Sequence, residues 1–260
     1  MSRGFFTSAR AQTYRVPHPR VPERWIAAVH LALVRAFVLI RSDGRDLANA
    51  DEDDITYWLE DKLENRLMCD DSSDLDLSFI RSVTRESATA NHDEKSKGRK
   101  PDLVFRLQRE LCQTHNRVQD SLFSECKPVD VKHPLHAHYC AVGKKTSGIE
   151  RFVIGAYASA MEQGIMIGYA RDKFCITRDL ADSLAKPETR VGLGEPSALL
   201  CVIAASSPHC QGLYLSTHKR HFPWVDGRAA TPIDLYHYWH DCCGVAQRYE
   251  PLARHQQQQN

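Results

Sequence analysis

The chain has 260 residues, of which 42% are hydrophobic and 26% are charged. These values are ordinary for a globular protein, and the length is ample for a sizeable core. The formal net charge of +1 excludes an overall basic signature, so a nucleic-acid partner would need a local basic patch. No internal repeat, Walker-type glycine loop, Gly-x-Ser-x-Gly elbow or strong linker is present, and we expect one domain over 21–245.

Cysteine usage favours a cytoplasmic protein. The nine cysteines are odd in number and have no regular spacing, and Cys126, Cys175 and Cys201 lie in apolar, strand-like runs. This pattern is typical of reduced thiols rather than of a disulfide scaffold. No signal peptide is evident, and the most apolar run, residues 25–40, contains a histidine and an arginine and is short for a bilayer span.

The first hundred residues predict two helices and a strand. Residues 1–20 are polar and basic, which predicts a flexible arm. Apolar residues recur at helical spacing over 22–41, between Pro22 and Gly44, and again over 51–68, where an acidic run suits the helix start. Apolar and polar residues alternate over part of 77–84, which predicts a strand. The polar stretch 87–100 predicts a mobile loop, with DNA clamping as the alternative.

The stretch from 100 to 129 contains two short apolar runs that carry acidic groups. Asp102 precedes the run 103–107, and Glu125 and Lys127 lie within the run 121–129. Side chains alternate along a strand, so Glu125 and Lys127 point the same way. If the two strands are neighbours, Asp102 reaches the same edge as Glu125, and two carboxylates and an ammonium converge.

Such an arrangement has a chemical use. Two close carboxylates repel each other unless a cation lies between them. Magnesium favours oxygen ligands and commonly takes one or two carboxylates. A bound metal makes water acidic enough to attack a phosphate and offsets the charge that develops on phosphorus.

Pro101-Asp102 and Glu125-Cys126-Lys127 resemble the motif of the PD-(D/E)XK nuclease superfamily. The resemblance covers residues from about 50 to 220. It implies an α/β fold with a restriction endonuclease-like core, a mixed central sheet flanked by helices. The helix at 22–41 and a C-terminal helix would be additions to that core.

The resemblance also implies a metal-dependent nuclease acting on DNA. Asp102 and Glu125, with the carbonyl of Cys126, would bind Mg²⁺, with Mn²⁺ as a substitute, and Lys127 would assist the attacking water. Many members place a further glutamate on a helix beside the metal. Glu52 is our choice because it shares a helix face with Ile55 and Leu59; the alternatives are Glu60 and Glu64. The expected pathway is restriction or anti-phage defence, and repair or a mobile-element role are the open alternatives. The enzyme would act as a homodimer or as a subunit of a defence complex, and no membrane partner is expected.

The second half of the chain predicts further helices and strands. Helices are expected at 148–164, 177–186 and 231–242, and strands at 165–170, 198–205 and 212–217. Residues 188–196 predict a loop. The tail from 246 to 260, with its glutamine run, predicts disorder.

Several basic residues are candidates for nucleic-acid contacts: Lys100, Lys144, Lys145, His218, Lys219 and Arg220. An edge strand protected by charge is the alternative reading of the cluster at 218–221.

Two further function classes stay open. One is a catalytically inactive nucleic-acid-binding or assembly protein on the same fold, against which the intact Asp, Glu and Lys argue. The other is a zinc-stabilised interaction module built on His133, His136, His138, Cys140 and the pair at 242–243, although the usual ligand spacing is absent. The sequence does not distinguish DNA from RNA or reveal a recognition sequence.

Overall fold

The computed structural model describes residues 15–70, 74–87, 89–90, 97–110, 115–143, 147–224 and 226–243. Within these ranges the chain forms a seven-stranded sheet in the order β1-β4-β5-β6-β9-β8-β7 and a separate pair of β2 with β3. The strands of the large sheet, in spatial order, are β1 (Ile80–Arg85), β4 (Leu103–Leu107), β5 (Ser121–Val129), β6 (Gln163–Ala170), β9 (Ile233–Asp241), β8 (Cys210–His218) and β7 (Leu200–Ile203). The small pair is β2 (Thr89–Ala90) and β3 (Lys97–Arg99).

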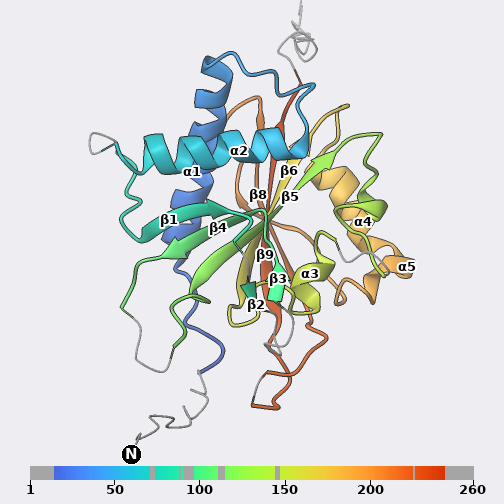
Figure 1. Ribbon diagram of the computed structural model, residues 1–260. Helices are drawn as coiled ribbons and strands as arrows, with labels where there is room; N and C mark the ends of the chain where they lie inside the picture. Colours follow the sequence, from blue (N-terminus) through green and yellow to red (C-terminus); the bar gives the residue numbers. More distant parts are fainter. Residues whose placement is uncertain are drawn as a thin grey trace, which may run out of the picture.

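The large sheet is mixed, as expected from the resemblance. β5, β6 and β9 run parallel in its centre, whereas the β1–β4, β4–β5, β9–β8 and β8–β7 pairs are antiparallel. All nine residues of β5 and all eight of β6 are buried, as expected for central parallel strands. The α/β class is therefore confirmed (Figure 1).

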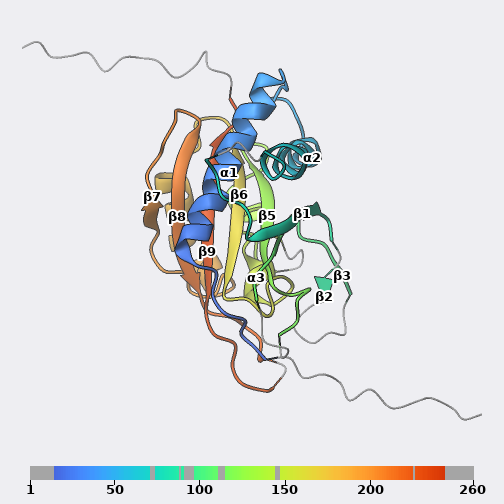
Figure 2. The ribbon, with the colours of Figure 1, turned by 90° about the vertical axis from the view of Figure 1, so that its left-hand side faces the viewer.

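Helices cover the sheet. The longer ones are α1 (Glu23–Ser42) and α2 (Glu52–Lys62), and α2 continues into the π-helical turn η1 (Leu63–Leu67). The shorter ones are η2 (Leu135–Ala137), α3 (Glu150–Val153), η3 (Ile176–Leu180), α4 (Ala181–Ala185) and α5 (Pro187–Arg190). Tyr169 of β6 contacts both Phe37 of α1 and Thr56 of α2, so the two long helices pack on the same region of the sheet. Figure 2 shows α1 running along the sheet.

By length and composition alone, α1 could cross a membrane. In the folded protein, however, its residues Val29, Leu33, Phe37 and Ile40 are fully buried, and the ring of Phe37 stacks on that of His240 in β9, with centroids 3.8 Å apart. These contacts are typical of the core helix of a soluble protein. The cytoplasmic location stays a prediction.

The predicted helix at 148–164 is wrong for most of its length. Only α3 is helical, and β6 already begins at Gln163. Gly155 and Ala158 have φ values of 72° and 50°, which a right-handed helix cannot contain. The small residues that suggested close helix packing instead form turns that bring the chain back to the sheet.

The predicted C-terminal helix at 231–242 is also wrong. This segment is β9, which lies between β6 and β8 in the sheet. Because both faces of β9 are covered, its residues do not alternate between apolar and polar, and the aromatic residues Tyr238 and Trp239 are both fully buried. A strand of this kind lacks the period-2 pattern by which strands are recognised in a sequence.

The start of the described chain is packed against the domain, although the sequence predicts a flexible arm there. His18 is buried, and its backbone N–H donates to the carbonyl of Ala160 at 2.7 Å. Arg109 donates to the carbonyls of Pro19 and Arg20. These contacts apply to residues 15–20; the rest of the predicted arm and the predicted tail at 246–260 lie outside the described residues.

Other predicted elements match closely. The helices at 22–41, 51–68 and 177–186 and the strands at 77–84, 165–170, 198–205 and 212–217 correspond to elements within a few residues at each end. The predicted loops at 87–100 and 188–196 contain the short pieces β2 and β3, and α5, respectively.

Candidate functional site

The pairing of β4 with β5 brings Asp102 beside Glu125. The two strands are antiparallel, and Leu103 pairs with Ser124, so the residue before Leu103 lies opposite the residue after Ser124. Oδ2 of Asp102 accepts a hydrogen bond of 2.7 Å from the backbone N–H of Cys126. The Asp102 carboxylate is therefore fixed directly at the backbone of β5.

The Lys127 ammonium lies between three carboxylates. Its Nζ atom is 2.6 Å from Oε1 of Glu52, 3.1 Å from Oε1 of Glu125 and 3.2 Å from Oδ2 of Asp102. It also donates to the carbonyl oxygen of Cys126 at 2.5 Å. The structure thus brings together the four residues that the sequence singles out, although they come from three separate segments.

The start of α2 positions Glu52. The side chain of Asp51 caps the helix by accepting from the backbone N–H of Asp54 at 2.8 Å. One turn later, Thr56 accepts or donates a 2.8 Å hydrogen bond with the hydroxyl of Tyr169 in β6. These contacts fix the first turn of α2 over β5 and β6, so Glu52 extends to the ammonium.

The two alternative glutamates on this helical segment lie elsewhere. Oε1 of Glu60 accepts from the backbone N–H of Arg85 at 2.8 Å, and Oε2 of Glu64 accepts from that of Val83 at 2.5 Å. Both carboxylates therefore bind the backbone of the edge strand β1. Of the three candidates, Glu52 is the one that contacts Lys127.

Arg151 and Tyr157 complete the cluster. The sequence reasoning missed Arg151, whereas it interprets Tyr157 as an aromatic packing residue that could orient substrate. Nη1 of Arg151 donates to Oε2 of Glu125 at 2.9 Å and to the Tyr157 hydroxyl at 2.5 Å. Tyr157 in turn donates to the carbonyl of Lys100 at 2.6 Å, two positions before Asp102. No short motif connects these residues to Glu125, and the predicted helix over 148–164 would have placed them differently.

Burial and charge set the protonation of the cluster. Burial raises the pKa of Glu125 to about 7, with repulsion from Asp102 adding to the effect and Lys127 and Arg151 opposing it. Burial likewise raises the pKa of Glu52. Burial lowers the pKa of Lys127, but attraction to Glu125, Asp102 and Glu52 outweighs it, so the pKa lies above its ordinary value. Lys127 is therefore a permanent cation near neutral pH.

The donor set suits a hard cation. Asp102, Glu125 and the Cys126 carbonyl offer only oxygen atoms, and these atoms already surround a positive charge. Among the residues that the structure describes, no three His, Cys, Asp or Glu side chains form a ready-made metal cluster. The Lys127 ammonium contacts the oxygens that a metal ion would use, so a metal would have to replace it there.

Two of the predicted DNA contacts are not available. His218 is fully buried, and its Nδ1 lies 2.6 Å from the carbonyl of Leu193. Arg220 is also buried and donates to the carbonyls of Ala158 and Met161. Both side chains hold loops in place, and the prediction that they contact phosphate is wrong.

The other predicted DNA contacts have mixed outcomes. Lys219 is exposed and pairs with Glu195, and Lys100 is exposed and lies 3.2 Å from Glu86. Pairs this exposed are weak, so a phosphate can compete for both lysines. Lys144 and Lys145 lie outside the described residues.

The zinc reading finds no support in the described part of the chain. Nδ1 of His133 pairs with Oδ1 of Asp130 at 2.8 Å. Within the described ranges, no group of three His, Cys, Asp or Glu side chains lies close enough together to hold a metal ion.

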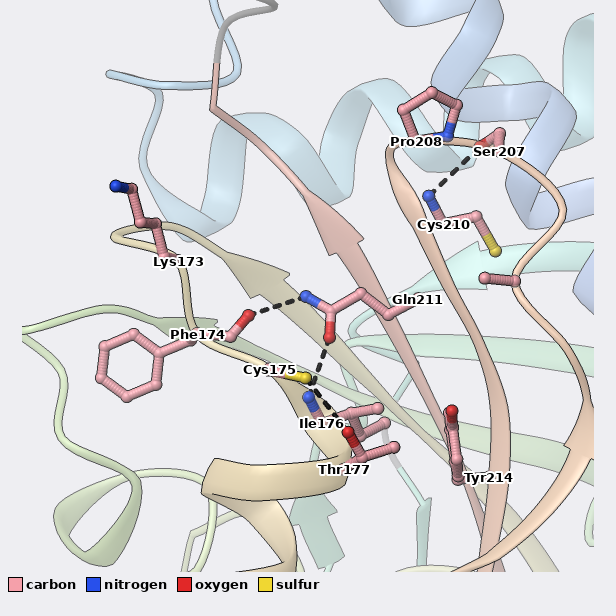
Figure 3. Close-up of a pocket in the computed structure, with 11 residues that line it drawn as sticks. Lys173, Phe174, Cys175, Ile176, Thr177, Ser207, Pro208, Cys210, Gln211 and Tyr214 are labelled. Carbon is pink, nitrogen blue, oxygen red and sulfur yellow. Dashed lines mark hydrogen bonds between the residues drawn. The ribbon is translucent and has the colours of Figure 1, made fainter. Parts of the chain in front are cut away.

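One cavity adjoins the cluster, and another lies away from it. A cleft of about 660 Å³ includes Glu52 and Pro128 in its walls and so adjoins the Lys127 ammonium. A second cavity, of about 730 Å³, is lined by Cys175, Gln211 and Tyr214 among others (Figure 3). Gln211 there bridges the carbonyl of Phe174 and the N–H of Ile176, and none of the four clustered residues lines it. The candidate site is therefore the cluster with its adjoining cleft.

In comparisons with known proteins, no family model, no curated protein and no solved structure matches the chain. The likeness to the PD-(D/E)XK nucleases therefore depends on the motif residues and on their arrangement in this chain.

Proposed function

We propose that this protein is a metal-dependent nuclease that hydrolyses DNA phosphodiester bonds. The observation that carries the proposal is the convergence of Glu52, Asp102 and Glu125 on Lys127 at the junction of β4, β5 and α2. Buried carboxylates of raised pKa beside a cleft are typical of functional sites. A purely structural core would gain as much from apolar residues at these positions.

Each residue has a role in the proposal. Asp102, Glu125 and the Cys126 carbonyl hold Mg²⁺, for which Mn²⁺ can substitute. When bound, the metal acidifies a water molecule and offsets negative charge on phosphorus. Lys127 donates hydrogen bonds to the attacking water and to the negative charge that develops in the transition state. Glu52 holds the Lys127 ammonium in place, and Arg151 holds Glu125.

The wider setting is proposed from the resemblance alone. It places the activity in restriction or anti-phage defence in the cytoplasm, by a homodimer or as a subunit of a defence complex. A two-site assembly would cut both strands of a duplex.

The decisive experiment is a cleavage assay with supercoiled plasmid and magnesium. Wild-type protein is expected to nick or linearise the plasmid, and EDTA to stop it. Asp102→Asn is expected to reduce cleavage at least about 100-fold, while its melting temperature stays close to that of the wild type. Asp226→Asn is the matched control and should cut normally, because it changes an exposed acid whose ion pair, within the described residues, is with Arg228. Wild-type cleavage by Asp102→Asn would overturn the assignment.

The alternative is a catalytically inactive nucleic-acid-binding or assembly protein on the same fold. One observation favours it, because the Lys127 ammonium already neutralises the carboxylates internally, as in a structural ion cluster. A metal titration separates the two functions. An inactive binder holds DNA equally well in chelator and in magnesium and never nicks it.

A further inference from the structure

The two edges of the large sheet differ in how they are protected. At the β1 edge, the carboxylates of Glu60 and Glu64 accept hydrogen bonds from backbone N–H groups of the strand. At the other edge, β7 is the last strand in the order, and the described chain places no further strand beside it (Figure 2). The outer side of β7 therefore presents backbone groups with which a strand of another molecule can pair.

The residues in and around β7 carry no charge. The run from 197 to 206 contains neither an acid nor a base, and most of its residues are exposed. Leu200 and Val202 keep 62% and 42% of their surface accessible. Edge strands of soluble proteins commonly carry charged residues or proline, which prevent pairing with another molecule, and β7 has neither. This edge is therefore suited to a partner rather than to solvent.

An apolar groove of about 390 Å³ lies between β7 and the start of α1. Ile26 and Ala27 line it from the helix, and Leu200, Val202 and Leu215 line it from the sheet. The apolar side chains that β7 directs towards α1 are thus only partly covered by the helix. A second molecule that pairs with β7 would cover them further, which favours association through the hydrophobic effect.

The rim of this groove carries an acid and a base next to each other. Glu23 and Arg24 both line the groove and are exposed, and neither forms an ion pair within the described residues. In a two-fold dimer the same patch of both copies meets, so Glu23 of one copy can face Arg24 of the other, twice. The charge pattern of the rim is therefore complementary to itself, which favours a second copy of this chain over an unrelated partner.

We propose that β7 and the adjoining groove form a homodimer interface, in which β7 pairs antiparallel with β7 of a second copy. An antiparallel pair has two-fold symmetry, so the same edge can supply both sides. β7 has four residues and a register shift between Cys201 and Ile203, so the backbone pairing is short and the apolar groove supplies most of the contact. The interface does not depend on the proposed nuclease function, because no residue of β7 belongs to the Lys127 cluster.

This pairing would place the two Lys127 clusters far apart. In the strand order, four spacings separate β5 from β7 within each copy, and one more spacing crosses the interface. At about 4.8 Å for each spacing, the two β5 strands lie roughly 43 Å apart along the combined sheet. Each cluster would therefore act on its own, and loss of the dimer should leave the nicking of single strands unchanged.

The first test measures the mass of the full chain by sedimentation equilibrium in EDTA and reducing agent. Wild type at about 100 µM, which populates even a weak dimer, is expected to approach twice the chain mass of 29.6 kDa. Val202→Lys places like charges across the two-fold axis and should weaken the dimer at least about 100-fold. Val118→Lys is the matched control, because Val118 is also an exposed valine but precedes β5, far from β7 in the strand order.

The second test exchanges the two charges of the rim. Glu23→Arg and Arg24→Glu alone should each weaken the dimer about fivefold, because each brings like charges together. The double variant with both changes re-forms the two pairs and should dimerise within about twofold of the wild type. Melting curves identify any damage to α1, since Glu23 lies in its first turn.

Three results would overturn the interface. They are a wild type that stays monomeric at about 100 µM, even if it binds an extended peptide of another protein, equal weakening by Val118→Lys and Val202→Lys, and a double charge exchange that is weaker than either single change. Plasmid nicking keeps the two proposals separate. A dimer that Val202→Lys dissociates but that never nicks DNA keeps the interface and loses the nuclease function, whereas a monomer that nicks has the opposite meaning.

Discussion

The Nζ atom of Lys127 lies 2.6 Å from Oε1 of Glu52, although 75 positions separate the two residues in the chain. This contact joins the first turn of α2 to the middle of the sheet. It is also one of the contacts by which a single ammonium group binds three carboxylates. Each acid can be tested separately because they come from different segments.

Glu52 should matter for cleavage, whereas Glu60 and Glu64 should not. Glu52→Gln removes a carboxylate from Lys127 and is expected to reduce cleavage at least about tenfold. Glu60→Gln and Glu64→Gln alter hydrogen bonds to β1 that lie away from Lys127, so these variants should cut normally and lose about 1 kcal/mol of unfolding free energy or less. Plasmid cleavage and urea unfolding of the three variants check this. Equal loss of activity in all three would mean that α2 has only a structural role.

Replacing Lys127 should separate metal binding from catalysis. Lys127→Met leaves the buried acids without their cation, which is expected to cost about 3 kcal/mol of stability in EDTA. The same change should strengthen Mn²⁺ binding at least about tenfold, because the ammonium no longer competes for the oxygens, and should abolish cleavage. Calorimetric titration with Mn²⁺ and melting curves with and without metal measure both effects. Weaker Mn²⁺ binding in the variant would contradict a shared cation position.

Glu125 should make stability depend on pH. Its pKa in the folded protein, about 7, is above the ordinary value of 4.5 that applies when unfolded. The folded state therefore binds the proton more tightly, so this contribution to stability is fully present below pH 4.5 and is lost as the pH rises through 7. Urea unfolding at pH 5 and 7.5 should show a larger fall for wild type than for Glu125→Gln. Parallel falls in the two proteins would argue against the raised pKa.

Arg151 should control the ionisation of Glu125. Arg151→Met removes the 2.9 Å ion pair from a buried carboxylate, so the pKa of Glu125 should rise further and the acidic limb of the pH–cleavage profile should move to higher pH. Arg151→Lys keeps a positive charge and should restore part of the profile. A profile that stays in place while activity falls in Arg151→Met would indicate a packing role only.

Substitution of Gly168 should test whether β9 is a core strand. A Cβ atom on Gly168 would lie 2.4 Å from Cδ1 and 2.6 Å from Nε1 of Trp239 in β9. Gly168→Ala should therefore cost about 3 kcal/mol of unfolding free energy. A Cβ atom on Gly227 would meet no atom of the described residues within 4 Å, its chain neighbours aside, so Gly227→Ala should cost only about 1 kcal/mol, through its φ of 85°. Similar melting temperatures for the two variants would be inconsistent with β9 packing against β6.

The site residues that the sequence predicts correctly are those whose positions depend on local pattern. Asp102, Glu125 and Lys127 were found because a short motif lies in two strands that pair directly, and Glu52 because helical spacing places it on the face of α2 that meets the sheet. These inferences needed only neighbouring elements and their periodicities.

The rest depended on contacts between distant segments. Arg151 contacts Glu125 from a four-residue helix, where the sequence predicts a long one. The positive φ at Ala158, which prevents a longer helix, cannot be recognised from the residue type. His218 and Arg220 look like surface donors, but their partners are backbone carbonyls that no pattern identifies. The sequence predicts a helix where β9 lies, because both faces of this strand are buried and its residues do not alternate.

The position of β9 between β6 and β8 has a consequence for synthesis of the protein. Residues 233–241 are translated near the end of the described chain, yet they occupy an interior place in the sheet. While the ribosome is still making the chain, β6 lacks its neighbour, and β7 and β8 can pair only with each other. Complete assembly of the sheet therefore waits until β9 has been made, so a chain that terminated before residue 233 would lack the strand that joins β6 to β8.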